Sequence, residues 1–194
     1  MALVRVEAKL GSRSVPGEEQ LIARARAMEA AAWDEIYTEH FSAIYRYCSF
    51  RITEPGACED LTSEVFLEAV RGIRRYQYRG VSFRAWLYRI AHNLVADERK
   101  RRLRQSSVEV AEPEGPAEPG GPDFAPALVD RSDLQQALRQ LTEDQQQVVV
   151  LRFVEGLSLQ ETATVMGRPS GAIKALQHRA MVRMRGLLAG EVRG

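Results

Sequence analysis

The chain has 194 residues, of which 45% are hydrophobic and 27% are charged, and its formal net charge at pH 7 is +1. This composition is typical of globular proteins, and no uncharged run is long enough for insertion into a membrane. The first twenty residues contain charges from Arg5 onward and no apolar stretch, which argues against a secretory signal.

The sequence gives no support for metal or disulfide chemistry. Cys48 and Cys58 do not form a CxxC pair, and the three histidines are scattered, so no cluster has metal-ligand spacing. We interpret the cysteines as buried thiols in a reducing cytoplasm rather than as a disulfide or a redox switch. We therefore expect a cytoplasmic protein with no metal and no other cofactor.

Charge is strongly segregated along the chain. Residues 54–68 carry five acids and no base, whereas residues 71–104 carry eleven bases and two acids. Residues 105–130 carry six acids and no base, and residues 168–185 carry five bases and no acid. Such segregation creates local fields of opposite sign, which the net charge conceals.

A proline-rich segment divides the chain into two units. Residues 107–130 contain five of the eight prolines and three glycines, with too little apolar sequence to form a core. We expect a disordered N-terminal extension, a first small helical domain, a flexible acidic linker and a second small helical domain. Their expected bounds are residues 1–17, 18–104, 105–131 and 132–190.

Both units are predicted to be all-α. In the first unit, apolar residues recur at every third or fourth position around Leu21, from Trp33 to Cys48, from Leu61 to about residue 74, and over residues 82–102. No stretch shows the polar and apolar alternation of a strand.

Helix boundaries are better marked in the second unit. Two hydroxyl residues each precede a Glu or Gln by three positions, which is the spacing of a capping box, and two glycines stand where helices should end. These residues are Thr142 with Gln145, Ser158 with Glu161, Gly156 and Gly167. They predict helices over about residues 132–140, 143–155, 159–166 and 170–188.

The last two predicted helices have the spacing of a helix-turn-helix motif, with the small Ala163 at the helix crossing and Gly167 in the turn. One face of the final helix is apolar and should pack inward: Ile173, Leu176, Ala180, Met184 and Leu187. The opposite face suits reading of the DNA major groove: Gly171, Lys174, Ala175, His178 and Val182, flanked by Arg179. The alternative is a basic solvated helix of any α-domain. We favour DNA binding because spacing, caps and missing acids agree.

Residues 82–102 allow two interpretations. An apolar seam is predicted to be core: Phe83, Leu87, Ile90 and Leu94. A neighbouring stripe combines Trp86, Arg89, Asn93 and Lys100. Rings stack on unpaired bases, while amides and cations bind base edges and backbone, so this stripe suits single-stranded nucleic acid. A tryptophan at the core margin beside solvated arginines is the alternative, and periodicity alone leaves both open.

Residues 58–102 (CEDLTSEVFLEAVRGIRRYQYRGVSFRAWLYRIAHNLVADERKRR) closely resemble conserved region 2 of bacterial extracytoplasmic-function (ECF, group IV) sigma factors. Residues 141–188 (LTEDQQQVVVLRFVEGLSLQETATVMGRPSGAIKALQHRAMVRMRGLL) resemble their region 4. The resemblance implies a dissociable promoter-specificity subunit that promotes DNA melting and transcription initiation and is not itself an enzyme. Region 2 would bind the β′ clamp helices of core RNA polymerase and capture a base of the single-stranded −10 element. Region 4 would lie on the β flap and read the duplex −35 element. An anti-sigma factor is a common further partner.

The resemblance also assigns three sets of site residues. The set expected to bind core polymerase is Asp60, Leu61, Glu64, Val65 and Phe66. The set expected to bind −10 DNA is Tyr76, Phe83, Trp86, Arg89, His92 and Asn93, together with Arg99 and Lys100 of the basic run that follows. The set expected to bind −35 DNA is Arg168, Ser170, Gly171, Lys174, Ala175, His178 and Arg179.

Two other classes of function explain the sequence less well. A stand-alone helix-turn-helix regulator that does not engage polymerase would leave the resemblance of residues 58–102 unexplained. A nuclease using Glu59, Asp60 and Glu64 would need a metal site and a cleft that faces phosphate, yet these acids lie in a segment without bases. The chain also departs from the family at Ala27-Met28-Glu29, where a Gly-Asp turn is usual.

Overall fold

The computed structural model describes residues 16–52, 54–78, 81–106, 137–138 and 140–191, and the regular structure in these ranges is helical. The expected all-α fold is therefore confirmed. Most of the predicted extension, linker and helix over 132–140 lies outside the described residues.

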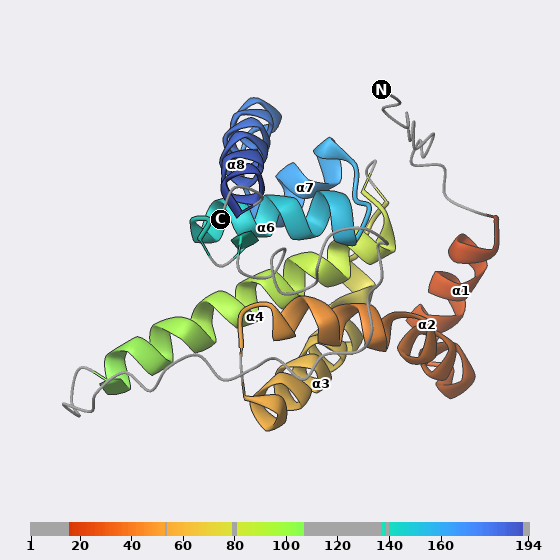
Figure 1. Cartoon of the computed structure of the whole chain (residues 1–194). Coiled ribbons are helices and arrows are strands. Elements are labelled where there is room, and N and C mark those ends of the chain that lie inside the picture. Colours follow the sequence, from red (N-terminus) through yellow and green to blue (C-terminus); the bar gives the residue numbers. More distant parts are fainter. Residues whose placement is uncertain (1–15, 53, 79–80, 107–136, 139, 192–194) are drawn as a thin grey trace.

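The first unit consists of α1 (Pro16–Arg26), α2 (Ala30–Ser49), α3 (Pro55–Gly72), the 3₁₀ turn η1 (Ile73–Arg75) and α4 (Phe83–Ser106). The second unit consists of α6 (Glu143–Val149), the π-helical turn η2 (Val150–Val154), α7 (Leu159–Met166) and α8 (Ser170–Glu191). α4 crosses the molecule with α2 and α3 on one side and α6 and α7 on the other, and its C-terminal end projects beyond them (Figure 1).

Local sequence explains two junctions in the first unit. Pro55 begins α3, at a position where its missing N–H removes no intrahelical hydrogen bond. The tight junction between α1 and α2 places Met28 in the left-handed region, with φ of 61°. This is the segment in which the usual family glycine is absent, and the turn forms with a methionine instead.

Burial on α4 is wider than the predicted seam. Phe83 and Leu87 are buried as expected, but Ile90 and Leu94 are only half-buried. A second set of α4 residues is fully or almost fully buried: Ala85, Tyr88, Ala91 and Val95. The seam prediction was therefore incomplete. Its physical reason is that α4 packs against α7 as well as against α2 and α3.

Caps and glycines define the second unit as predicted, with one difference. The Ser158 amide donates to Glu161 Oε2 at 2.9 Å, and the Glu161 amide donates to Ser158 Oγ at 3.2 Å. Gly156 and Gly167 both have positive φ, at 66° and 61°. The single helix predicted over 143–155 is instead α6 followed by the wider turn η2.

The two units share a hydrophobic core. Leu87 and Tyr88 of α4 belong to the same buried cluster as Leu151 and Val165 of the second unit. Cys48 and Cys58 are both buried in this cluster, as predicted.

The left-handed cap of α7 gives a stability prediction. Substituting Gly167→Ala places a Cβ at φ of 61° and should lower the free energy of unfolding by about 1–2 kcal/mol. The matched control is Gly186→Ala, inside α8 with open space around it, which should raise that free energy by up to about 1 kcal/mol. Urea unfolding followed by circular dichroism measures both, and equal effects of the two substitutions would contradict the assigned cap.

Candidate functional site

The exposed face of α8 matches the predicted recognition face. Ile173, Leu176, Ala180 and Met184 are buried, and Leu187 is half-buried. The predicted contact residues are exposed except Ser170, which is half-buried: Arg168, Ser170, Gly171, Lys174, Ala175, His178 and Arg179. Arg168 lies in the turn before α8 and pairs with Asp144 at 2.6 Å. The helix therefore offers small and basic side chains at its N-terminal end, as reading of a DNA groove requires.

Three aromatic residues form a cluster at the start of α4. The ring centroids of Tyr76 and Trp86 lie 5.1 Å apart, and those of Phe83 and Trp86 lie 5.4 Å apart. Tyr76 and Phe83 are buried, whereas Trp86 is half-buried. A Cβ added at Gly72 would lie 3.1 Å from the Trp86 ring, so this glycine permits the ring to lie close to the backbone. The cluster gives Trp86 a firm apolar base and leaves part of its ring accessible.

The polar residues predicted to bind DNA from α4 are distributed differently from the expectation. Asn93 and Lys100 are exposed, and Lys100 Nζ lies 3.4 Å from Asp97. Arg89 donates to the backbone oxygen of Thr164 at 3.2 Å, and the His92 ring contacts the Gln147 side chain. Arg99 pairs with Glu143. Arg89, His92 and Arg99 thus all contact the second unit.

Burial and charge also affect His92. Burial and the neighbouring Arg51 guanidinium lower the pKa of His92 below its ordinary value, so the neutral ring is favoured. A neutral imidazole can accept one hydrogen bond and donate another. This suits its position beside the Gln147 amide better than it suits an ion pair with phosphate.

The acidic part of α3 is only partly a surface. Asp60 is exposed, Leu61 and Glu64 are partly exposed, and Glu64 accepts a hydrogen bond from Arg71 at 3.1 Å. Val65 and Phe66, which the resemblance assigned to the same surface, are 0% and 6% exposed. As placed here they belong to the core beneath the surface. Periodicity along α3 already puts them on its inner face.

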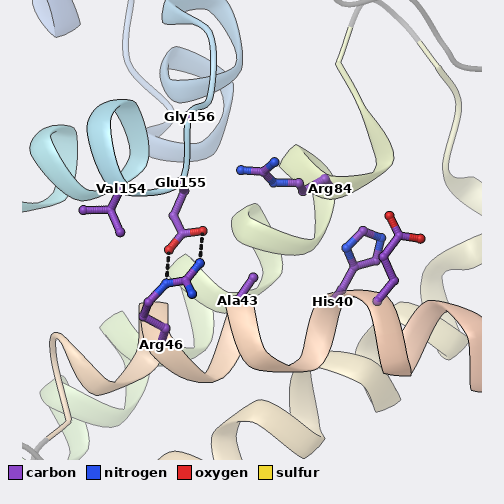
Figure 2. A pocket seen from close by; sticks show the side chains of 8 residues that line it. His40, Ala43, Arg46, Arg84, Val154, Glu155 and Gly156 are labelled. Atoms are coloured by element: carbon purple, nitrogen blue, oxygen red, sulfur yellow. Dashed lines mark hydrogen bonds and ion pairs between the residues drawn. The ribbon is translucent and has the colours of Figure 1, made fainter. Parts of the chain in front are cut away.

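Sequence reasoning missed the buried side chain of Glu155. It is 1% exposed and lies between the two units (Figure 2). Arg46 of α2 donates to both of its oxygens, at 2.8 and 2.9 Å, and the Tyr88 hydroxyl of α4 also donates to it. The hydrogen bond to Glu155 raises the pKa of Arg46, and burial raises the pKa of Tyr88.

A polar cavity of about 340 Å³ adjoins this group (Figure 2). Its lining joins α2, the start of α4 and the end of η2, and includes His40, Arg46, Arg84, Glu155 and Gly156. Arg84 Nε is buried and makes no hydrogen bond within the described residues. Nothing in the sequence pattern indicated this cavity, because its lining comes from residues far apart in the chain.

The sequence pattern also did not predict two further contacts between the units. Gln147 donates to the Tyr47 hydroxyl at 2.6 Å, and the Ser82 hydroxyl donates to Glu161. Burial raises the pKa of Glu161, but hydrogen bonds from Ser82 and Ser158 outweigh it and bring the pKa below its ordinary value. The capping-box spacing identified Glu161 as a helix cap, but it gave no signal for the contact with Ser82.

Two kinds of feature are absent from the part of the chain that the structure describes. No group of three or more His, Cys, Asp or Glu residues there is arranged to bind a metal ion. No helix there is both long enough and apolar enough to cross a membrane.

Comparison with known proteins identifies relatives of both units. Residues 36–105 match the family described as Sigma-70 region 2, and residues 137–186 match Sigma-70, region 4. The ECF RNA polymerase sigma factor BldN of Streptomyces coelicolor is 41% identical over 177 residues, which cover 90% of this chain and 67% of BldN. The ECF RNA polymerase sigma factor ShbA of Streptomyces griseus is 32% identical over 177 residues, which cover 86% of this chain and 93% of ShbA.

A solved structure has a similar fold. It contains the sigma factor RpoE in complex with the anti-sigma factor NepR from Bartonella quintana. The TM-score is 0.65 at 22% sequence identity, and the match covers 80% of this chain and 96% of that chain.

The aromatic cluster predicts a stability difference along α4. Replacing Trp86 by Ala removes a half-buried ring from Tyr76 and Phe83, and should lower the free energy of unfolding by about 2–3 kcal/mol, less than for a fully buried ring. Asn93→Ala, on the exposed side of the same helix, should change it by less than about 0.5 kcal/mol. Urea unfolding of the two variants measures this difference. If the Trp86→Ala protein were as stable as the Asn93→Ala protein, the packing of the Trp86 ring against Tyr76 and Phe83 would contribute nothing to stability.

Proposed function

The chain belongs to the family of ECF RNA polymerase sigma factors, and we propose that it directs core polymerase to promoters through three separate surfaces. The observation that carries this function is the succession of a Sigma-70 region 2 and a Sigma-70 region 4 on one chain. A stand-alone helix-turn-helix regulator would need only the second of these. In a sigma factor, both units contribute to promoter recognition and transcription initiation.

We propose residues 18–104 as the region 2 domain, residues 105–131 as the linker and residues 132–190 as the region 4 domain. α1 packs against α2 and η1, which supports its inclusion in the first domain although the family match begins at residue 36. Both family matches otherwise lie almost entirely within the proposed bounds.

The first proposed surface binds the unpaired strand of the −10 element. Trp86 supplies a partly exposed ring above Tyr76 and Phe83, and stacking on such a ring contributes about 1–3 kcal/mol per base. Asn93 is exposed two turns farther along α4 and is suited to a base edge. Arg89, Arg99 and Lys100 are assigned to contacts with the DNA backbone, and His92 belongs to the same proposed surface as a neutral hydrogen-bonding ring.

The second proposed surface binds the duplex −35 element. It consists of the exposed residues near the start of α8, where Lys174 and His178 lie one turn apart on the same face. Arg179 flanks this face, and Gly171 and Ala175 leave room for close approach to bases. Arg168 and Ser170 are assigned to the adjacent phosphates, because they precede or begin the helix.

The third proposed surface binds core polymerase. Asp60, Leu61 and Glu64 of α3 would contact the β′ clamp helices, with Val65 and Phe66 supporting them from the core. Region 4 would in addition lie on the β flap. This arrangement separates an acidic face for protein from the basic segment proposed for DNA.

Three broader assignments follow from this function. We propose that the protein acts in the cytoplasm, where core polymerase works, and that the chemistry of RNA synthesis belongs entirely to the core enzyme. An anti-sigma factor is a further proposed partner, of the kind that accompanies RpoE in the complex with NepR. A cofactor is not needed for any of these contacts.

Charge reversal on α3 tests the polymerase-binding surface. The double substitution Asp60→Lys with Glu64→Lys should weaken binding to core polymerase by more than tenfold, because it places cations where carboxylates are proposed to meet the partner. The fold should persist, since neither carboxylate is buried. A pull-down with core polymerase measures binding, and circular dichroism checks the fold.

The matched control is Glu29→Lys with Glu35→Lys. These acids are also exposed, at 51% and 56% of the side chain, and they lie near the junction of α1 and α2. The control changes the net charge equally and should leave binding to core polymerase unchanged. Undiminished binding by the folded Asp60→Lys, Glu64→Lys protein would refute the assignment of α3.

A further inference from the structure

The two residues that support the Trp86 ring are both held through their backbones by α1. Arg26, the last residue of α1, donates from its guanidinium to the carbonyl oxygen of Tyr76. Glu18, in the first turn of α1, accepts from the backbone N–H of Phe83, with 3.0 Å between Oε1 and the nitrogen. Tyr76 follows η1 and Phe83 begins α4, so one helix binds both ends of the connection between them.

The contact with Glu18 caps the start of α4 together with Ser82. The first four N–H groups of a helix have no partner within it, and a carboxylate is favoured there because that end of the helix dipole is positive. Ser82 Oγ accepts from the Ala85 amide at 3.2 Å, while Glu18 accepts from the Phe83 amide. The course of the backbone at the start of α4 therefore depends on a side chain of α1.

The contact with Arg26 holds the other end of the connection. The backbone of Tyr76 is extended where η1 ends, and its carbonyl oxygen accepts from Arg26. The Tyr76 hydroxyl donates to the Val81 carbonyl oxygen at 3.2 Å, and its ring packs edge-on against Phe83 with 5.5 Å between the centroids. Arg26 thus holds the backbone from which the Tyr76 ring extends toward Trp86.

The Trp86 ring has little freedom to lie elsewhere. It packs on the rings of Tyr76 and Phe83, and a Cβ added at Gly72 would lie 3.1 Å from its Cζ2 atom. The ring is therefore bounded by two side chains and a glycine, and it remains half-buried. Because stacked rings must lie close and offset, a shift of either supporting ring changes the face that Trp86 offers to a base.

α1 is anchored by residues other than Glu18 and Arg26. Leu21 and Ala25 are buried in the core, and Trp33 Nε1 of α2 donates to the Ala25 carbonyl oxygen at 3.1 Å. Glu18 is half-buried and Arg26 is exposed, so neither contributes much to the packing of α1. Loss of either side chain should therefore release one end of the connection while α1 stays in place.

We propose that α1 positions the ring on which an unpaired base stacks, through Glu18 and Arg26 acting on the backbones of the two residues that support Trp86. Both are positioning residues, because they act through the aromatic cluster and do not themselves contact DNA. The effect on DNA rests on the proposed function of Trp86 in binding the −10 element. Both residues precede residues 36–105, the segment that matches Sigma-70 region 2.

Fluorine NMR of the full chain labelled with fluorotryptophan tests the positioning without DNA. The chain has two tryptophans, Trp33 and Trp86, and the Trp86→Phe variant assigns their resonances. Glu18→Ala and Arg26→Ala should shift or broaden the Trp86 resonance, because each releases a backbone that supports the ring. The Trp33 resonance should stay at its wild-type position, because its indole N–H reports the anchoring of α1 to α2.

Binding of the holoenzyme to an unpaired −10 strand tests the consequence for DNA. The probe is a promoter fragment that gives a discrete transcript with the wild-type protein and core polymerase, prepared with its −10 region already unpaired. Glu18→Ala and Arg26→Ala should weaken binding of the holoenzyme to this fragment by about fivefold, as expected when one stacking contact is partly lost. Binding to a duplex that carries only the −35 element should change by less than about twofold, because that surface belongs to the other unit.

Conservative substitutions separate positioning from charge. Glu18→Gln keeps a side-chain oxygen that can accept from the Phe83 amide, and Arg26→Lys keeps a donor for the Tyr76 carbonyl oxygen. Both should bind the unpaired fragment within about twofold of wild type, because a neutral or shorter partner still makes the hydrogen bond.

The matched controls are Glu19→Ala and Arg24→Ala, which remove the same charges from the same helix. Glu19 is exposed, and Arg24 forms ion pairs only with side chains that are themselves more than half exposed, Glu29 and Glu35. Such ion pairs contribute little to stability. Both controls should therefore keep the wild-type Trp86 resonance and the wild-type affinity for the unpaired fragment.

The outcomes separate the positioning from the proposed function. A wild-type Trp86 resonance in both Glu18→Ala and Arg26→Ala would overturn the positioning, as would a joint shift of the Trp33 resonance, since α1 would then have detached as a whole. Equal weakening of DNA binding by Glu18→Gln and Glu18→Ala would also overturn it, because charge alone would then be responsible. Normal binding of the unpaired fragment by Trp86→Ala holoenzyme would overturn the stacking function of Trp86, and the resonances of the free proteins would still decide the positioning.

Discussion

A carboxylate buried in the interface between two units needs hydrogen-bond donors from the facing unit, and Glu155 imposes this constraint on the contact between the units. Glu155 is the residue that follows η2, directly before Gly156, whose backbone has a positive φ. Its partners Arg46 and Tyr88 come from α2 and α4. α4 then has helices of its own unit on one side and helices of the second unit on the other. α4 is therefore buried on two sides, and some of the residues proposed to bind DNA are partly covered.

Features decided within one or two helical turns could be predicted from the sequence. The inward face of α8 was predicted from the spacing of Ile173 and Leu176, and its exposed face from Lys174 and His178, because a 3.6-residue period fixes which side chains share a face. The cap formed by Ser158 and Glu161 was predicted for the same reason. These patterns place a helix-turn-helix in the second unit without any information about the first.

Features that depend on distant residues could not be predicted. Arg46 and Glu155 are 109 positions apart, and no periodicity connects them. The buried Tyr88 and Ala91 lie outside the seam that periodicity picks out on α4, since a helix covered on two sides no longer has a single apolar face. Family resemblance assigns Val65 to a binding surface from its place in a motif, whereas packing buries its side chain in the core. Motifs locate a functional helix, and packing decides which of its residues are accessible.

The central claim is that one chain gives core polymerase its promoter specificity through two domains, one for each promoter element. Run-off transcription with core polymerase on fragmented DNA from the source genome tests it most directly, with fragments bearing the −10 element alone or both elements at their natural spacing. The account predicts discrete transcripts that depend on the added protein and require both elements. Retention of the protein by core polymerase without any discrete transcript, or transcripts unaffected by loss of the upstream element, would contradict it.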